Sequence, residues 1–282
     1  MPVRIIVDST ADLLPHVAKR VKIIPLTIRF GDREYVDGVT MNSEKFYEML
    51  VESDELPTTS QANPAAFAEA FAEAVEAGCE VVCITCSGKL SGTNQSAVIA
   101  AEDYPGKVFV VDSRTIALGS AILTEYALEL ADRNCSAEEI AWKLLQKREK
   151  VRLIAMLDTL EYLKKGGRIS ATVAFAGGLL NIKPVVSIED GEIKMLGKAR
   201  GSRQGNNLLV QEIRKSGGVD FKKPLLLGYT GLSDALLRKY IADSAELWQG
   251  NADQLPVQVV GSVVGTHAGP GAVAVAFFSA EE

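Results

Sequence analysis

The stretch CEVVCITCSGKLSGTNQSAVIAAE, residues 79–102, predicts a strand, a loop and a helix in succession. Residues 80–86 are apolar and rich in β-formers, which is typical of a buried strand. The loop at 87–93 is small and hydroxyl-rich, and it leads into a helix whose first N–H groups and positive dipole end are open. Two interpretations remain: Ser91 binds a carboxylate or phosphate there, or Ser91 is only an N-cap.

A second hydroxyl-rich loop precedes another predicted helix. Asn63 is a good N-cap and Pro64 suits the first helical position, so Thr59 and Ser60 fall just ahead of that helix. If both loops lie at the edge of a parallel sheet, they converge on one ligand head group. Turn chemistry alone is the alternative explanation for such hydroxyls.

Length and composition limit the class of protein. The 282 residues suggest two domains, and the net charge of −6 and 6% aromatic content argue against a nucleic-acid-binding surface. Asp8 interrupts the N-terminal apolar run before a signal peptide could form, and the apolar run at 272–278 is too short to span a membrane. We therefore expect a cytoplasmic protein.

The cysteines and histidines do not form a metal-binding pattern. Cys83 and Cys86 have C-x-x-C spacing, but residues three apart on a strand face opposite sides, and only His16 and His267 are available as histidine ligands. We expect no metal site and interpret all the cysteines as reduced thiols.

The fold class is predicted to be α/β with two domains. Residues 1–150 alternate strands and helices, which predicts a parallel α/β layer domain that carries the carboxylate-binding loops. In residues 151–282 the hairpin signal Asp190-Gly191 predicts an α+β domain with a mixed or antiparallel sheet. That half contains a predicted helix at 171–180, an exposed basic loop at 198–203 and a glycine-rich loop at 265–271 that holds His267.

Several motifs together resemble one family. They are IIVDSTADL at 5–13, TSQ at 59–61, LSGT at 90–93, VVDS at 110–113, LEYLKKGGRIS at 160–170 and THAGPGA at 266–272. In this order they are similar to the DegV family, whose fatty-acid-binding members are called FakB proteins. The resemblance covers nearly the whole chain. It departs from the family pattern at Ala62, Asn94 and Cys86, which leaves the acyl preference open.

The resemblance implies a function and a set of site residues. It implies a carrier without chemistry or cofactor of its own that binds a long-chain fatty acid. The carrier presents the carboxyl group to a separate fatty acid kinase, FakA, for acyl phosphate formation in bacterial phospholipid synthesis, with no more than transient contact with a membrane surface. The ligand-binding residues it implies, with Thr59 and Ser91 on the carboxylate, are Thr59, Ser60, Ser91, Gly92, Arg168 and His267. It assigns kinase docking to Arg200 and Arg203.

Physical chemistry agrees with a lipid ligand. A buried carboxylate needs hydrogen bonds to replace its hydration, and hydroxyls beside a helix start supply them. About fifteen tail carbons contribute roughly 12 kcal/mol at ~0.8 kcal/mol per CH₂ before association costs. Candidate tail-lining residues are Phe175, Leu179, Leu180, Ile182 and Val185, and for each of them taken singly a place in the core is the better interpretation.

Two other functions are alternatives to a lipid carrier. A serine hydrolase would use Ser91 as nucleophile, His267 as base and Asp8 or Asp112 to orient the base, but the G-x-S-x-G elbow is missing. A nucleotide-binding module would use the basic, glycine-rich residues 164–168, but neither phosphate-binding glycine motif follows a predicted strand. We expect that basic loop to lie over the head-group opening instead.

Overall fold

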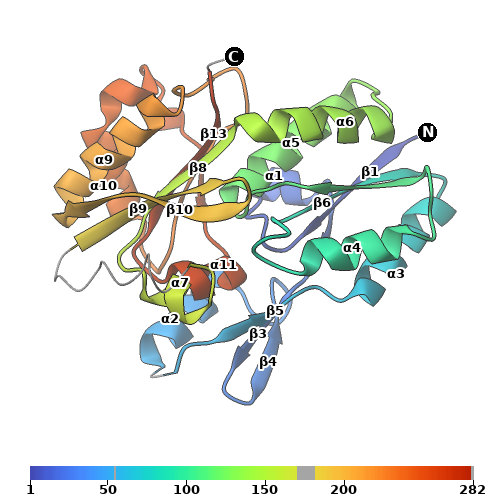
Figure 1. The fold of residues 1–282 in the computed structure, drawn as a ribbon, viewed down its shortest axis with the longest axis horizontal. Coiled ribbons are helices and arrows are strands. Elements are labelled where there is room, and N and C mark those ends of the chain that lie inside the picture. The colour runs from blue at the N-terminus through green and yellow to red at the C-terminus, as the bar shows by residue number, and fades with distance from the viewer. Residues whose placement is uncertain (54, 170–181, 281–282) are drawn as a thin grey trace.

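The computed structural model describes residues 1–53, 55–169 and 182–280, and it confirms the predicted α/β class. A parallel sheet lies in the N-terminal part, a mixed sheet in the C-terminal part, and a small antiparallel sheet below both (Figure 1). The predicted helix at 171–180, with Phe175, Leu179 and Leu180, falls outside the described residues.

The N-terminal sheet has the strand order β2-β1-β6-β7, and every pairing in it is parallel. Its strands are β1 (Val3–Asp8), β2 (Lys22–Ile24), β6 (Glu80–Thr85) and β7 (Val108–Asp112). One face is covered by α3 (Pro64–Glu76) and α4 (Thr93–Ala101), the other by α5 (Leu118–Asp132) and α6 (Ala137–Lys147). The predicted N-cap Asn63 and the Ser136–Glu139 capping box are both present. Strand β6, the Ser91 loop and α4 thus follow one another as predicted.

The small antiparallel sheet changes the predicted setting of Thr59 and Ser60. It consists of β3 (Thr27–Phe30), β4 (Arg33–Val36) and β5 (Thr58–Ser60), with α2 (Ser43–Glu52) beside it. The prediction of a loop at Thr59 was wrong, because Thr59 pairs with Ile28 across β3 and β5. Strand pairing therefore fixes the backbone that carries the Thr59 hydroxyl.

The C-terminal sheet has the order β10-β9-β8-β13-β11-β12 and is antiparallel except between β11 and β12. Its strands are β8 (Val151–Met156), β9 (Ile182–Glu189), β10 (Glu192–Arg200), β11 (Leu226–Tyr229), β12 (Val257–Val259) and β13 (Val273–Phe278). The predicted hairpin is confirmed, since Asp190 and Gly191 both have positive φ, at 50° and 81°.

Helices cover the C-terminal sheet on both faces. One face carries α9 (Gly201–Lys215) and α10 (Ala235–Asp243), and the other faces α5, which packs against strands of both large sheets. In the described part of the chain, the other helices are α1 (Pro15–Ala18), α7 (Glu161–Lys165), α11 (Ser262–Ala268) and 3-10 turns at Arg148–Lys150, Ala245–Trp248 and Ala252–Gln254. The division at residue 150 stays a prediction.

Two predicted loops are regular structure instead. Residues 262–268 form α11, so His267 lies in the last turn of a helix and not in a glycine-rich loop. Glycine is needed at position 265 of that helix, because a Cβ there would lie 2.6 Å from Tyr47 Oη of α2. The predicted basic loop at 198–203 was also wrong: β10 ends at Arg200 and α9 begins at Gly201.

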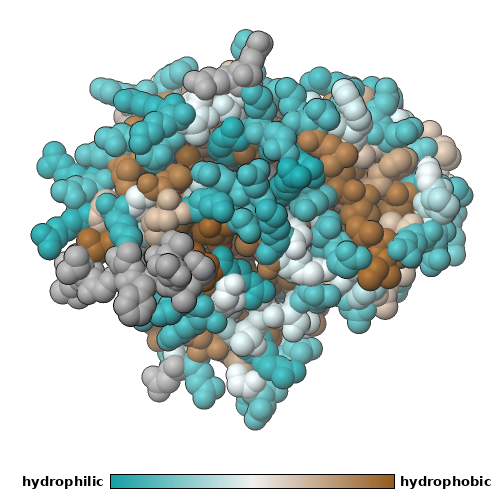
Figure 2. Space-filling view, in the orientation of Figure 1, coloured by the Kyte–Doolittle hydropathy of each residue, from teal (hydrophilic) through white to brown (hydrophobic). Residues whose placement is uncertain are grey.

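On the face drawn in Figure 2, hydrophobic residues gather in patches among hydrophilic ones. On the right of that face they gather over the N-terminal sheet and α4, where Val98 and Ile99 are exposed. Among the described helices, none combines the length and the apolar character needed to cross a bilayer.

Candidate fatty-acid cavity

A largely apolar cavity lies between the two large sheets and beneath α7 and α11. It encloses about 1010 Å³ of space, part of which is open to solvent. The polar lining residues are Thr10, Thr59, Ser60, Gln61, Ser91, Arg168, Ser187, Tyr229, Thr230 and His267, and the rest are almost all aliphatic.

The long wall of the cavity is a row of small residues on adjacent strands. Ala274 of β13 pairs with Ala155 of β8 on one side and Gly228 of β11 on the other, and all three line the cavity. Leu153 of β8 and Leu157, the residue that follows this strand, face the same space, about 13 Å apart at ~3.3 Å per residue of extended chain. The cavity therefore extends from the α7 end of the sheet, at Leu157, toward Leu153.

Of the candidate tail-lining residues, Ile182 and Val185 do not line the cavity, and for Val185 the favoured interpretation as core is confirmed. Val185 is buried in the core on the other face of the sheet, and Val186 and Ile188 line the cavity instead. Alternate residues of a strand face opposite sides, so Val185 and Val186 project to different faces of the sheet.

The polar end of the cavity contains a hydrogen bond between Thr59 and His267. Thr59 Oγ1 and His267 Nε2 are 2.9 Å apart. Burial, followed by the nearby Arg168 charge, lowers the pKa of His267 from 6.5 to about 4, so its imidazole is neutral near pH 7. Nδ1 is buried without a hydrogen-bond partner among the described residues, against the backbone of Gly166.

Ser91 lies on the same cavity, just before α4. Its hydroxyl oxygen accepts a hydrogen bond from the Thr93 backbone N–H at 3.2 Å and lies 2.9 Å from Thr93 Oγ1. Arg168 Nε donates to the carbonyl of the neighbouring Leu90 at 3.2 Å, and its Nη1 donates to the carbonyl of Gly166. The guanidinium thus connects the Ser91 loop to the end of α7 and brings a positive charge to the polar end.

Buried and partly buried groups hold the Ser91 loop from behind. Asp8 Oδ2 accepts from the Cys86 backbone N–H at 2.7 Å; burial raises the pKa of Asp8, although hydrogen bonds from Thr10 and Cys86 oppose that shift. Ser87 Oγ donates to the carbonyl of Gly191 at 2.7 Å, which fastens the tip of the β9–β10 hairpin to the loop. The loop that carries Ser91 is therefore braced from both sheets.

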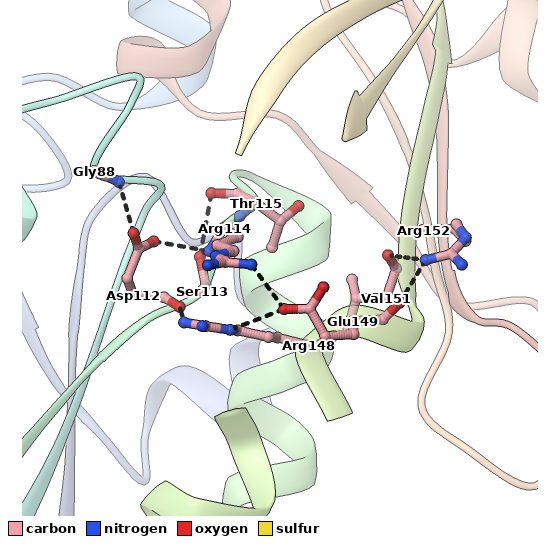
Figure 3. A network of polar contacts seen from close by, with 9 residues as sticks. All are labelled: Gly88, Asp112, Ser113, Arg114, Thr115, Arg148, Glu149, Val151 and Arg152. Atoms are coloured by element: carbon pink, nitrogen blue, oxygen red, sulfur yellow. Dashed lines mark hydrogen bonds and ion pairs between the residues drawn. The ribbon is translucent and has the colours of Figure 1, made fainter. Parts of the chain in front are cut away.

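A surface network extends this support (Figure 3). Asp112 Oδ2 accepts from the Gly88 backbone N–H at 3.3 Å, and Arg148 donates to the Asp112 carbonyl at 2.6 Å. Glu149 accepts from Arg114 at 3.0 Å in the same cluster. The acidic residues Asp8 and Asp112 therefore hold loop backbone, and neither bonds to His267.

The predicted site residues do not all lie in the cavity. It is lined by Thr59, Ser60, Ser91, Arg168 and His267. Gly92 lies outside the lining and contacts Gln61 instead, because a Cβ there would lie 2.0 Å from Gln61 Oε1. Arg200 and Arg203 are exposed where β10 meets α9, away from the cavity lining.

Two residues at this site were not predicted as site residues. Gln61 lines the cavity, and its position in the TSQ motif was the available signal. Thr93 is fully buried and connects the two hydroxyl-bearing segments, because its Oγ1 also accepts from the Ala62 backbone N–H at 3.2 Å. Its place in the LSGT motif could have indicated that role.

The geometry offers little support for a hydrolase. The base predicted for Ser91, His267, is hydrogen-bonded to Thr59, and no carboxylate bonds to its Nδ1 among the described residues. No cluster of three potential metal ligands occurs in the described parts of the chain. What the arrangement provides is hydroxyl donors and the Arg168 cation at the polar end of an apolar chamber.

Comparison with known proteins gives consistent results. The sequence profile of the DegV family, described as uncharacterised proteins, matches residues 2–280. A DegV domain-containing protein of Caldanaerobacter subterraneus is 35% identical over 279 residues, covering 98% of each chain.

Two solved structures have the same fold along nearly their whole length. The fatty-acid-binding DegV family protein of Thermus thermophilus has a TM-score of 0.87 and 31% identity, covering 99% of this chain and 100% of that one. The Streptococcus pneumoniae fatty acid kinase B3 protein, loaded with linoleic acid, has a TM-score of 0.82 and 25% identity, covering 99% of each chain.

Proposed function

Because the chain belongs to the DegV family, we propose that it is a cytoplasmic carrier of a long-chain fatty acid. The observation that carries the proposal is a single cavity with an aliphatic body and a hydroxyl-lined end that also contains Arg168. An aliphatic chamber is suited to an acyl tail, and hydroxyl and guanidinium donors are suited to a carboxylate. The solved relatives that bind fatty acids support the same ligand class.

The protonation of His267 supports Thr59 as a donor to the ligand. A neutral imidazole has one N–H, and a buried N–H without an acceptor is rarer than a buried bare lone pair. Since Nδ1 has no partner among the described residues, the proton belongs on Nε2, which donates to Thr59 Oγ1. The Thr59 hydroxyl then retains its own proton for the carboxylate.

The proposed orientation places the carboxylate at Thr59 and Ser91 and the tail toward Leu153. Arg168 offsets the negative charge from the same end. The aliphatic wall supplies most of the affinity, while the polar end sets the direction in which the lipid is held. With the carboxylate held by the polar end, this orientation suits presentation of the carboxyl group to another protein.

We further propose a separate ATP-using kinase as the partner that converts the presented carboxyl group to an acyl phosphate. The likeness to the fatty acid kinase B3 protein supports this step. Exposed Arg200 and Arg203, outside the cavity, are the proposed docking residues. In this proposal the carrier itself contributes no catalytic residue. The molecule bound in its cavity is a lipid and not a cofactor.

The test is native mass spectrometry of delipidated protein incubated with mixed fatty acids. We expect one bound fatty acid per chain, and the double variant Thr59→Val, Ser91→Ala should lose it. Gly88→Ala is not a suitable control because its Cβ would lie 3.2 Å from Asp112. Thr40→Val, at an exposed residue, and Ser53→Ala, at a partly exposed one, lie away from the cavity lining and are suitable. Wild-type protein that binds no fatty acid would reject the proposal.

A further inference from the structure

Thr93 is a fully buried hydroxyl at the first position of α4 with two polar neighbours. Its Oγ1 accepts from the Ala62 backbone N–H at 3.2 Å and lies 2.9 Å from Ser91 Oγ. Thr93 is outside the cavity lining, so its hydroxyl is not placed to contact a ligand.

The direction of the Thr93–Ser91 hydrogen bond follows from counting protons. Thr93 Oγ1 already accepts from Ala62, and a buried hydroxyl proton must be donated to an acceptor. Among the described contacts of Thr93 Oγ1, the acceptor available is Ser91 Oγ. Thr93 is therefore the donor and Ser91 the acceptor.

This direction determines what Ser91 can do. Ser91 Oγ has two lone pairs; one accepts the Thr93 backbone N–H at 3.2 Å and the other the Thr93 hydroxyl at 2.9 Å. With both lone pairs occupied from behind, Ser91 has only its proton left to offer to the cavity. A ligand at this point must be an acceptor.

We propose that Thr93 is a positioning residue that makes Ser91 an obligatory hydrogen-bond donor and so selects an anionic lipid head group. The inference rests on the proposed fatty-acid function and deepens it. In a chain of hydrogen bonds from Thr93 through Ser91 to a carboxylate, each bond polarises the next. Bonds to a charged acceptor gain most, so the effect favours a fatty acid over a fatty alcohol.

Thr93 also helps to dock the Thr59 segment on α4, and the test must separate the two roles. Gln61 Nε2 donates to Ser96 Oγ at 3.1 Å across the same junction. Ser96→Ala loosens that junction without removing a group that touches Ser91. It is the matched control for Thr93→Val, while Thr93→Ser retains the hydroxyl.

The experiment compares the full-length protein and these variants, each loaded with [1-¹³C]palmitate, by ¹³C NMR of the carboxyl group against pH. Affinities for palmitate and hexadecanol are measured in parallel. We expect Thr93→Val to lower the palmitate-to-hexadecanol affinity ratio about tenfold and to raise the pKa of the bound carboxyl by about one unit. Hexadecanol affinity stays the same, and Thr93→Ser and Ser96→Ala behave like wild type.

Each other outcome overturns the inference in a distinguishable way. An unchanged carboxyl pKa in Thr93→Val, with a shift in Ser91→Ala, shows that Ser91 donates without Thr93. Parallel loss of palmitate and hexadecanol in Thr93→Val, shared by Ser96→Ala, shows a purely structural role. Wild-type protein that binds neither compound rejects the proposed function together with the inference.

Discussion

Gly166→Ala should disable the polar end of the cavity without removing any polar group. A Cβ at Gly166 would lie 2.2 Å from His267 Nδ1, whereas ordinary contacts begin at 3.4 Å, so the imidazole must move by about 1 Å. The backbone itself tolerates alanine, because Gly166 has φ −73° and ψ −8°. A displacement of that size takes the 2.9 Å Thr59–His267 contact beyond hydrogen-bonding distance.

The magnitude follows from the lost bond. Thr59 is partly buried, and a hydroxyl shielded from water and deprived of its partner costs about 1–3 kcal/mol, which corresponds to a roughly 5- to 150-fold weaker Kd for palmitate. Isothermal titration calorimetry of delipidated protein measures this change in Kd. Gly167→Asn is the control, since Gly167 has open space around it and asparagine tolerates its φ of +72°.

A double-mutant cycle decides whether the effect acts through His267. In a His267→Ala background the added methyl group at position 166 has room, so Gly166→Ala should cost almost nothing there. Equal costs in both backgrounds, or normal affinity in Gly166→Ala, would refute the proposed coupling of Gly166, His267 and Thr59.

Three further predictions concern the tail, pH and the partner. Ala274→Leu fills the middle of the long wall, so the affinity for palmitate, measured by calorimetry, should fall by ~0.8 kcal/mol for each methylene group that no longer fits in the cavity. A ten-carbon acid should bind nearly as before. Equal losses for both acids would contradict a tail at this wall. Folding lowers the pKa of His267 from 6.5 to about 4, so between these pH values the unfolded chain binds one proton more than the folded protein. The stability that neutral His267 contributes to the folded state is therefore complete above pH 6.5 and is lost as the pH falls toward 4. Urea unfolding should show the stability advantage of wild type over His267→Gln shrinking by roughly 3 kcal/mol across that window, whereas a pH-independent difference would show a histidine that titrates normally. Arg200→Ala and Arg203→Ala should leave fatty-acid affinity unchanged but slow acyl phosphate formation by the kinase several-fold, and loss of affinity would show that these residues belong to the lipid site.

Local sequence signals predicted the elements that depend on local chemistry. The Asn63 cap, the Ser136 capping box and the Asp190-Gly191 hairpin each arise from contacts within a few residues, and all are present. The strand, loop and helix around Ser91 were predictable for the same reason: an apolar β-rich run, small residues and an alanine-rich run follow one another.

Elements that depend on distant partners were not predictable in this way. Thr59 lies on a strand only because Ile28, 31 positions earlier, pairs with it. His267 lies on a helix although glycines surround it, since Gly265 lets that helix approach Tyr47 of α2 closely. Hydroxyl and glycine content suggested loops in both places, and tertiary packing overrode those preferences.

The sequence predicted the candidate site only in part, for the same reason. Sequence motifs indicated which residues gather at the polar end, but the contact between Thr59 and His267 spans 208 positions. The direction of the hydrogen bonds at Ser91 depends on Thr93 and Ala62 together, and no single motif contains both. Which residues of β9 line the cavity depends on strand register, and that is why Val186 lines it and Val185 does not.

The most direct test of the central claim is a crystal structure of the protein bound to a fatty acid brominated at its tail end, with the bromine located by anomalous scattering. The account predicts the carboxylate within hydrogen-bonding distance of Ser91 and Thr59 and the bromine peak near Leu153. A bromine peak near Arg168, or a lipid bound outside the cavity, would contradict it.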